Sequence, residues 1–253
     1  QNMSLTGGIN FYKSNIEIQN LIFNNNMCED ALNITHSKLD IKNSKFLNTQ
    51  SDAFDADFSN VKMENIHFEN IIGDAIDTSG SKIEIYNITS NNVSDKSLSI
   101  GEKSVLQGSE IKIFNSKIGL ASKDSSIVKL KNISIKNSKV ADLISYRKKH
   151  LYGYGEILIN NADININKVF SEKPNYIKLE NLKINQSHVS RLIENKKPKC
   201  AYGLNCKRIS LTEDDKIVNK LEQFGLTMDT SLYYPTPIWE PRGGFNLDEE
   251  LIY

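Results

Sequence analysis

Apolar and polar residues alternate in short stretches along most of the chain. Pairs of apolar residues two positions apart, such as Leu39 and Ile41 or Ile83 and Ile85, are separated by segments rich in Asn, Ser and Asp. A period of two is typical of strands with one buried face, whereas amphipathic helices need apolar residues at i, i+3, i+4 and i+7. The pattern therefore predicts many short β-strands and excludes helical repeats.

A common phrase recurs at a fixed spacing in the first half of the chain. It stands as EDALNITHS, SDAFDADFS, GDAIDTSGS, DKSLSIGEKS and GLASKDSS. A repeat of about 20 to 29 residues indicates one supersecondary unit per repeat, with each unit stacked on its neighbours. With Ala31 as the anchor, equivalent positions fall every 22 residues in both directions: Ile9, Ala53, Ala75, Ser97, Gly119 and Ala141.

The apolar pairs that follow each phrase complete the repeat. They are Leu39 and Ile41, Val61 and Met63, Ile83 and Ile85, then, after a small slip, Ile111 and Ile113, and Val128 and Leu130. The L-x-x-L-x-L-x-x-N frame of leucine-rich repeats is missing. We predict an all-β, right-handed parallel β-helix solenoid of about eight coils, in which a residue lies ~4.8 Å from the residue 22 positions away.

Asparagines occupy the positions at which the chain should turn after each strand pair. Asn43, Asn65 and Asn87 are spaced by 22 residues. Asparagine tolerates the left-handed backbone conformation of tight turns, and stacked side-chain amides can hydrogen-bond from coil to coil. We therefore interpret these residues as structural.

The repeat ends before the last part of the chain. We expect the β-helix to occupy residues 1–195 and a separate region to occupy residues 196–253. In that region LTEDDKIVNKLEQFG combines a capping box with an apolar stripe and predicts one amphipathic helix. The tail after Ser231 contains three prolines and many aromatic residues, so we expect it to lie extended on the solenoid or on a partner.

Three cysteines are too few for a disulfide framework. Cys28 is close to the Ala31 anchor, and we expect it to lie in the interior stack. Cys200 and Cys206 enclose AYGLN and could close a small ring if the protein is exported. The spacing of Cys and His does not indicate a zinc site.

The chain carries 31 basic and 31 acidic residues. A balanced surface has no general attraction to nucleic acid or to anionic membranes, and no apolar run is long enough for membrane insertion. The first residues, QNMSLTGG, lack the charged and apolar segments of a signal peptide. Because the repeat is already running at Ile9, we expect the chain to be one part of a longer polypeptide.

Acidic residues gather at two positions of the repeat. Asp52 and Asp74 lie one position before the anchor, and Asp55 and Asp77 lie two positions after it. Carboxylates stacked on neighbouring coils repel one another, and burial raises the pKa of some of them. We therefore expect a compensating positive charge beside these four aspartates.

Two sources of positive charge could balance the aspartates. Lys96 continues the ladder of Asp52 and Asp74, and Lys103 and Lys123 follow on later coils. Calcium is the other source, because carboxylate oxygens on a rigid surface suit a hard cation, and all four aspartates would be its ligands. A third interpretation is structural, with the aspartates capping backbone N–H groups in tight turns.

A basic, aromatic and glycine-rich insertion, SYRKKHLYGYGE, interrupts the repeat after Ala141. Loops expelled from a solenoid commonly lie on its binding face. Aromatic faces combined with cations suit the recognition of sugar acids. We therefore predict substrate binding by Lys103 and by four residues of the insertion, and a solvated cap is the equal alternative for the insertion. The four residues are Arg147, Lys148, Tyr152 and Tyr154.

The repeated phrases resemble those of bacterial right-handed parallel β-helix proteins of the pectin-lyase-like superfamily, over roughly residues 7–190. Their order is also similar to that of polygalacturonases, in which N-T-D, G-D-D, G-H-G and R-I-K lie on successive coils. The resemblance implies that Asp52 and Asp74 match two of the motif aspartates and that Lys123 falls near the R-I-K lysine. The positions that depart from the motifs are Ala75, Lys96 and Ala121.

We expect a polysaccharide-associated module of a larger surface or envelope protein, which binds or scaffolds a glycan and needs no cofactor other than calcium if calcium is bound. One alternative is a polysaccharide lyase or glycoside hydrolase acting on acidic glycans. Another is a structural assembly subunit. The expected partners are a polysaccharide or cell-surface glycan and either the rest of a larger polypeptide or a homo-oligomer, in an extracellular or cell-envelope location. The candidate catalytic residues are Asp52, Asp55, Asp74, Asp77, Lys96 and Lys123.

Overall fold

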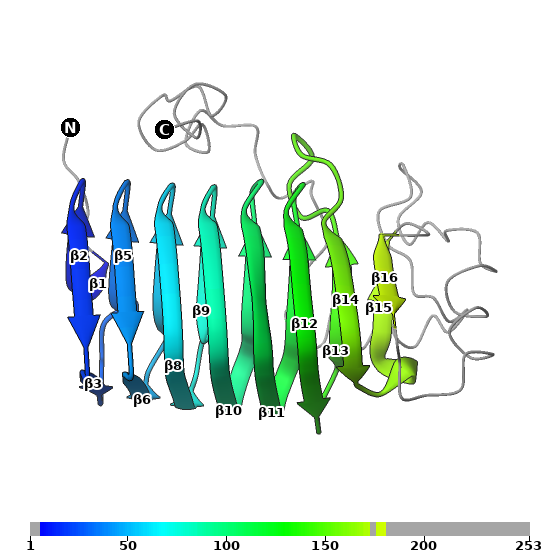
Figure 1. Cartoon of the computed structure of the whole chain (residues 1–253), viewed down its shortest axis with the longest axis horizontal. Helices are drawn as coiled ribbons and strands as arrows, with labels where there is room; N and C mark the ends of the chain where they lie inside the picture. Colours follow the sequence, from blue (N-terminus) through cyan, green and yellow to red (C-terminus); the bar gives the residue numbers. More distant parts are fainter. Residues whose placement is uncertain (1–5, 173–175, 181–253) are drawn as a thin grey trace.

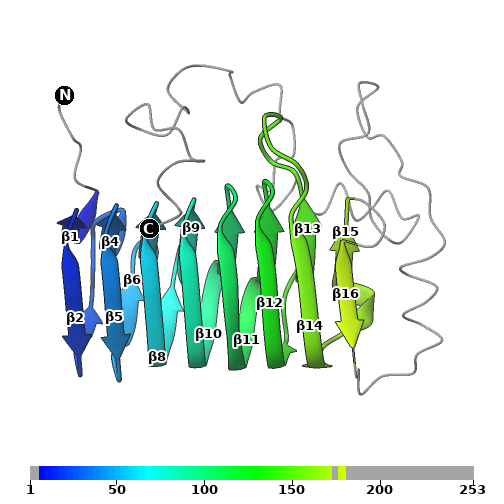
Figure 2. The ribbon, with the colours of Figure 1, turned by 45° about the horizontal axis from the view of Figure 1, so that its top comes forward.

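The computed structural model describes residues 6–172 and 176–180. These residues form one parallel β-helix of about eight coils, which follow one another from the N-terminal end to Glu180 (Figure 1). Every described strand pair is parallel. Figure 2 shows the same stack of coils from a second side. The predicted all-β solenoid is therefore confirmed.

The strands pair in three ladders, one on each face of the solenoid. The face that carries the repeated phrase, which we call the anchor face, contains β1 (Gly7–Tyr12), β4 (Asp30–Thr35), β7 (Asp52–Asp57), β9 (Ile76–Ser79), the last parts of β10 (Lys82–Gly101) and β11 (Val105–Lys123), β13 (Ala141–Tyr146) and β15 (Val169–Ser171). The second face contains β2 (Asn15–Gln19), β5 (Lys38–Lys42), β12 (Ile127–Lys136), β14 (Glu156–Asp163), β16 (Ile177–Glu180) and the first parts of β8 (Asn60–Ile71), β10 and β11. The third face contains β3 (Ile22–Asn24), β6 (Lys45–Thr49) and later parts of the long strands, and a short 3-10 helix, Ile166–Lys168, precedes β15.

Apolar side chains at equivalent positions fill the interior. On the anchor face Leu32, Phe54, Ile76, Leu98 and Leu120 follow one another from coil to coil, and each is at most 1% exposed. Burial of one such side chain contributes about 1.5–3 kcal/mol to stability. Since one coil cannot bury its interior alone, each coil is stabilised mainly by its neighbours.

The 22-residue spacing holds in the middle of the anchor face and fails at its ends. Ile9 pairs with Leu32, and Ile118 pairs with Ala141, so both pairs are 23 residues apart. Ile9 and Ala141 are therefore wrong as anchor positions. Coils tolerate a change of one residue because the extra residue falls in a turn, where it leaves the strand register intact.

The predicted change of spacing between the apolar pairs of two coils also lies at a different place in the structure. Ile83 pairs with Leu106, whereas Ile111 pairs with Ile88 on the third face, so the predicted equivalence of Ile83 and Ile111 is wrong. The coil between these strands has one extra residue. An irregularity between Val93 and Lys96 returns the ladder to the 22-residue spacing, as a β-bulge does.

The asparagine ladder is confirmed. Asn65 Nδ2 donates a hydrogen bond to Asn43 Oδ1 (2.9 Å), and Asn87 Nδ2 donates one to Asn65 Oδ1 (2.8 Å). All three residues have positive φ, between 50° and 56°. A second ladder of the same kind, which was not predicted, is formed by Asn48, Asn70 and Asn92.

Replacing Asn65 with Ala should lower the free energy of unfolding by about 1–2 kcal/mol, because alanine is strained at φ 56°. Replacing Asn65 with Gly removes the same amide hydrogen bonds but tolerates this φ, so we expect a smaller loss. Urea unfolding of the two variants measures the difference. Equal losses would show that the backbone conformation does not select asparagine here.

Some predictions concern residues outside the described part of the chain: the amphipathic helix, the aromatic tail, the pair Cys200 and Cys206, and the boundary at residue 195. Cys28 is described and is exposed, so its predicted place in the interior is wrong. It lies in the connection that precedes β4, before the chain enters the ladder. Within the described ranges, no helix has the length and apolar character needed to span a bilayer.

Candidate functional site

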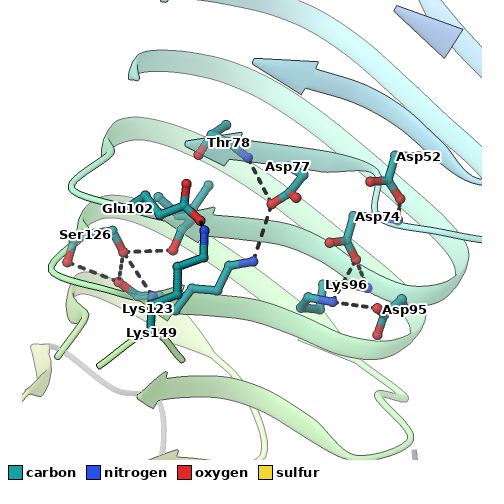
Figure 3. A network of polar contacts seen from close by, with 12 residues as sticks. Asp52, Asp74, Asp77, Thr78, Asp95, Lys96, Glu102, Lys123, Ser126 and Lys149 are labelled. Atoms are coloured by element: carbon teal, nitrogen blue, oxygen red, sulfur yellow. Dashed lines mark hydrogen bonds and ion pairs between the residues drawn. The ribbon is translucent and has the colours of Figure 1, made fainter. Parts of the chain in front are cut away.

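Acidic and basic side chains gather on the outward side of the anchor face, over β7, β9, β10 and β11 (Figure 3). One carboxylate oxygen from each of Asp52, Asp74 and Asp77 lies within 4.8 Å of the others. Lys96 and Lys123 point toward the same group. We call these five residues the acid–lysine cluster. The structure thus brings together five of the six predicted catalytic residues.

Two of the aspartates cap the backbone of the next coil. Asp52 Oδ1 accepts a hydrogen bond from the Asp74 N–H (2.7 Å), and Asp74 Oδ1 accepts one from the Lys96 N–H (2.8 Å). Gly73 leaves room for the first bond, since a Cβ there would lie 2.0 Å from Asp52 Oδ1. The local structure therefore explains why aspartate follows glycine in the G-D-A phrase.

Lys96 neutralises the buried end of the cluster. Its Nζ lies 3.1 Å from Asp74 Oδ1 and 2.5 Å from Asp95 Oδ2. Asp95 Oδ1 also lies 3.4 Å from Lys117 Nζ. The side chains of Lys96 and Asp74 are less than a tenth exposed, so this ion pair is shielded from water.

Lys123 reaches the cluster across an intervening coil. Its Nζ lies 3.5 Å from Asp77 Oδ1, two coils away. Gly101 stands between them, and a Cβ there would lie 3.0 Å from Lys123 Cε. A side chain at position 101 would therefore crowd Lys123 and weaken its contact with Asp77.

Asp52 and Asp77 differ in protonation. Burial and the neighbouring Asp74 carboxylate raise the pKa of Asp52 to about 8. Burial alone would also raise the pKa of Asp77, but Lys123 and Lys96 outweigh it and hold this pKa below the ordinary aspartate value. At neutral pH the cluster therefore holds a protonated carboxyl group beside an ionised one.

The lysines of the cluster stay charged. Burial would lower the pKa of each lysine, but Asp74 and Asp95 raise the pKa of Lys96, and Asp77 raises that of Lys123. An ammonium group held in this way is a poor general base. The geometry therefore disfavours a lyase in which Lys96 or Lys123 takes a proton from the substrate.

The aspartates fit calcium poorly. Lys96 already neutralises Asp74, and Lys123 already neutralises Asp77. A hard cation prefers several ionised oxygens without competing ammonium groups. Asp55, the fourth predicted ligand, is not one of the three carboxylates that approach one another.

Asp55 lies on the edge of the cluster. It pairs in register with Asp77, and its Oδ2 accepts a hydrogen bond from Asn33 Nδ2 (2.9 Å). Burial and the nearby Asp57 carboxylate raise the pKa of Asp55 well above the ordinary value. Asp52, Asp55, Asp57 and Asp77 are partly exposed, so the accessible part of β7 and β9 consists mainly of carboxyl groups.

The predicted binding loop, residues 147–155, folds onto one end of the anchor face. The backbone N–H groups of Lys148 and Lys149 both donate to Asp124 Oδ1 (2.7 Å each), and the Lys149 ammonium pairs with Glu102. Lys148 also contributes to the lowered pKa of Asp77. The loop therefore borders the acid–lysine cluster on its basic side.

The aromatic residues of the loop form a second group. The Arg147 guanidinium lies 5.2 Å from the centre of the Tyr154 ring, and Tyr154 packs edge to face on Tyr176. Tyr152 is partly buried, and burial raises its pKa to about 12. Lys103 is exposed, and its N–H donates to the Asp124 carbonyl oxygen (2.9 Å), so it lies near the base of the loop.

Three residues of the site were not predicted from the sequence: Asp95, Gly101 and Asp124. Asp95 precedes Lys96 directly, so the D-K pair in the sequence could have indicated that Asp95 belongs to the site. Gly101 and Asp124 gave none, because their roles depend on contacts across coils and with an inserted loop.

Comparison of the sequence with protein-family models and with curated proteins finds no match. The parallel β-helix is therefore established by the coordinates alone.

Stability should fall as the pH rises from about 4 to about 8, in part because of Asp52. The pKa of this residue is near 3.8 in the unfolded chain and about 8 in the folded chain, so the folded state binds the extra proton over this range. The stabilisation that Asp52 contributes is complete below its pKa in the unfolded chain. It is lost as the pH rises through its pKa in the folded chain. Urea unfolding across this range should show a flatter profile for Asp52→Asn than for the unmodified chain. Asp40→Asn, on the second face, is the control, and parallel profiles for Asp52→Asn and the unmodified chain would contradict the assignment.

Proposed function

We propose that the outward side of the anchor face binds a polysaccharide. Partly exposed carboxyl groups of Asp52, Asp55 and Asp77 lie on two neighbouring coils of this face, and Asp55 and Asp77 pair in register. Carboxylate oxygens accept hydrogen bonds from sugar hydroxyl groups, and a regular ladder of acceptors suits a ligand that itself repeats. The ladder of carboxyl groups on a rigid surface is the observation that carries this proposal.

The 147–155 loop supports the same proposal. It borders the cluster and presents the rings of Tyr152 and Tyr154 together with Arg147 and Lys148. Aromatic rings pack on the apolar faces of sugars, and the cations suit an acidic substituent. A glycan lying across the coils would donate hydrogen bonds from its hydroxyl groups to the carboxyl groups of the face. At one end it would contact the basic loop.

Hydrolysis of the glycan is the second candidate function. It is favoured by the opposite pKa shifts of Asp52 and Asp77, since a glycoside hydrolase needs a protonated acid and an ionised carboxylate near the same bond. Asp52 would donate the proton and Asp77 would act as the nucleophile, because carboxylate oxygens of the two residues lie within 4.8 Å, the close approach of retaining enzymes. Asp74, Lys96 and Lys123 would then set these two pKa values.

The wider context is part of the proposal. We infer a module of a larger surface or envelope protein, of the pectin-lyase-like kind and of bacterial origin, that contacts a cell-surface glycan outside the cell. The supporting observations are the β-helix architecture and the partly exposed carboxyl groups of β7 and β9. A purely structural assembly subunit would need no such ladder of partly exposed carboxyl groups.

Binding to a panel of neutral and uronate-containing polysaccharides tests the proposal. We expect at least one polysaccharide of the panel to bind the full chain. The double variant Asp52→Asn with Asp77→Asn should weaken that binding tenfold or more, and each tenfold loss of affinity corresponds to about 1.4 kcal/mol. Asp40→Asn, an aspartate of the second face, should bind like the unmodified chain. Release of reducing ends would establish the hydrolase, and unsaturated products would establish a lyase. Equal binding by all three proteins, or no binding to any member, would contradict the proposal.

A further inference from the structure

A groove of about 430 Å³ runs along the second face, over β11, β12, β14 and β16. Two ladders of outward side chains form its rims, because successive side chains of a strand point to opposite sides of a sheet. The first rim consists of Gln107, Lys129, Leu158 and Lys178. The second rim consists of Lys131, Asn160 and Glu180.

The charges of these two ladders change along the solenoid. On the N-terminal coils both of their lysines face acids: Lys62 Nζ lies 3.4 Å from Glu84 Oε2, and Lys42 Nζ lies 3.8 Å from Glu64 Oε2. From β11 onward, neutral residues occupy the ladder positions next to Lys129 and Lys131. They are Gln107, Ser109, Leu158 and Asn160.

The three lysines of the groove are exposed, and none of them forms an ion pair with another residue in the described part of the chain. Glu180 is the single acid that lines the groove, and its Oε2 accepts a hydrogen bond from Asn160 Nδ2 (3.4 Å). The groove therefore carries a local positive charge in a chain whose total charge is balanced. Such a local excess attracts anions.

We propose that this groove binds an acidic polysaccharide at a site separate from the anchor face. Lys129 and Lys178 lie two coils apart on one rim, so ~10 Å separates their positions along the solenoid. One coil rises by nearly the length of one sugar residue in an extended chain, so the two ammonium groups match carboxylates on alternate sugars. Leu158 lies between the two lysines and is partly exposed, so it offers an apolar contact to the intervening sugar ring.

Single-stranded nucleic acid is also a linear polyanion, but its binding sites combine cations with aromatic rings on which the bases stack. The groove has no aromatic residue among the described residues that line it. This observation favours the polysaccharide. The proposal does not depend on glycan binding by the anchor face, because the two sites share no residue.

Hyaluronate, which carries a carboxylate on alternate sugars, is the probe. We expect the full chain to bind it at about 50 mM salt and to lose most of this binding at about 200 mM salt. The double variant Lys129→Gln with Lys131→Gln should weaken the binding about tenfold or more. The control, Lys42→Gln with Lys62→Gln, removes the same charge from paired lysines of the same ladders and should change the binding by less than about twofold.

Asp52→Asn with Asp77→Asn leaves the groove intact and should keep the salt-sensitive binding, so failure of the groove and failure of the anchor-face site are distinguishable. Absence of hyaluronate binding to the full chain overturns the proposal, and so do equal losses for the two lysine double variants. Tighter binding of an oligothymidylate than of hyaluronate, with the same loss in Lys129→Gln with Lys131→Gln, assigns the groove to single-stranded nucleic acid and also overturns the proposal.

Discussion

Replacing Lys96 with Met is expected to lower the free energy of unfolding by about 3–5 kcal/mol, because it leaves buried Asp74 without its cation. The Lys96 ammonium is also paired with Asp95, so its loss leaves two carboxylates facing each other. Asp95 keeps Lys117, whereas Asp74 has no comparable second cation in direct contact among the described ion pairs. Urea unfolding with an unchanged m-value measures the effect.

Two further variants separate charge compensation from packing. Lys62→Met removes an exposed ion pair with Glu84 and should cost at most about 1 kcal/mol. The double variant Lys96→Met with Asp74→Asn should recover most of the lost stability, because the buried charge is gone and the amide oxygen can still accept the N–H of residue 96. A loss for Lys96→Met no larger than that for Lys62→Met would contradict the account of the cluster.

Phe46→Ala should destabilise the protein by about 3–5 kcal/mol. Phe46 is fully buried and stacks between Phe23 and Phe68, with ring centroids 4.4 Å and 5.0 Å away. Its removal leaves a cavity that three coils share, so the contacts on both sides are weakened together. Phe46→Leu should cost less because it keeps most of the volume.

The control for Phe46→Ala is Tyr86→Ala, on the outside of the second face. Tyr86 is 51% exposed, and its loss should change the free energy of unfolding by no more than about 0.5 kcal/mol. Thermal or urea unfolding of both variants gives the comparison. Similar small effects for both would show that the three rings do not form a cooperative stack.

The sequence was sufficient to predict the repeat, the stacking of the aspartates on two adjacent coils and the asparagine turns. These features follow from periodicity, since residues one coil apart are neighbours whenever the coil length is constant. Asp52 and Asp74, Asp55 and Asp77 were placed on adjacent coils for this reason, as the register confirms.

The errors of the sequence analysis arise where the coil length changes or where contacts skip a coil. The bulge between Val93 and Lys96 follows from local backbone geometry, and no residue pattern in the sequence predicts it. The contact of Lys123 with Asp77 depends on the missing side chain of Gly101, which only the packed coils reveal. Cys28 lies outside the ladder, so proximity to the anchor could not predict its exposure.

Titration of the aspartate carboxyl groups by carbon-13 NMR in the full chain tests the acid–lysine cluster most directly, with Asp52→Asn providing the assignment. We expect Asp52 to titrate near pH 8 and Asp77 below the ordinary value of 3.8, because the two residues share a cluster but differ in their nearest charges. If both carboxyl groups titrate independently near 3.8, the cluster does not exist in solution, and the proposed glycan site loses its chemical basis.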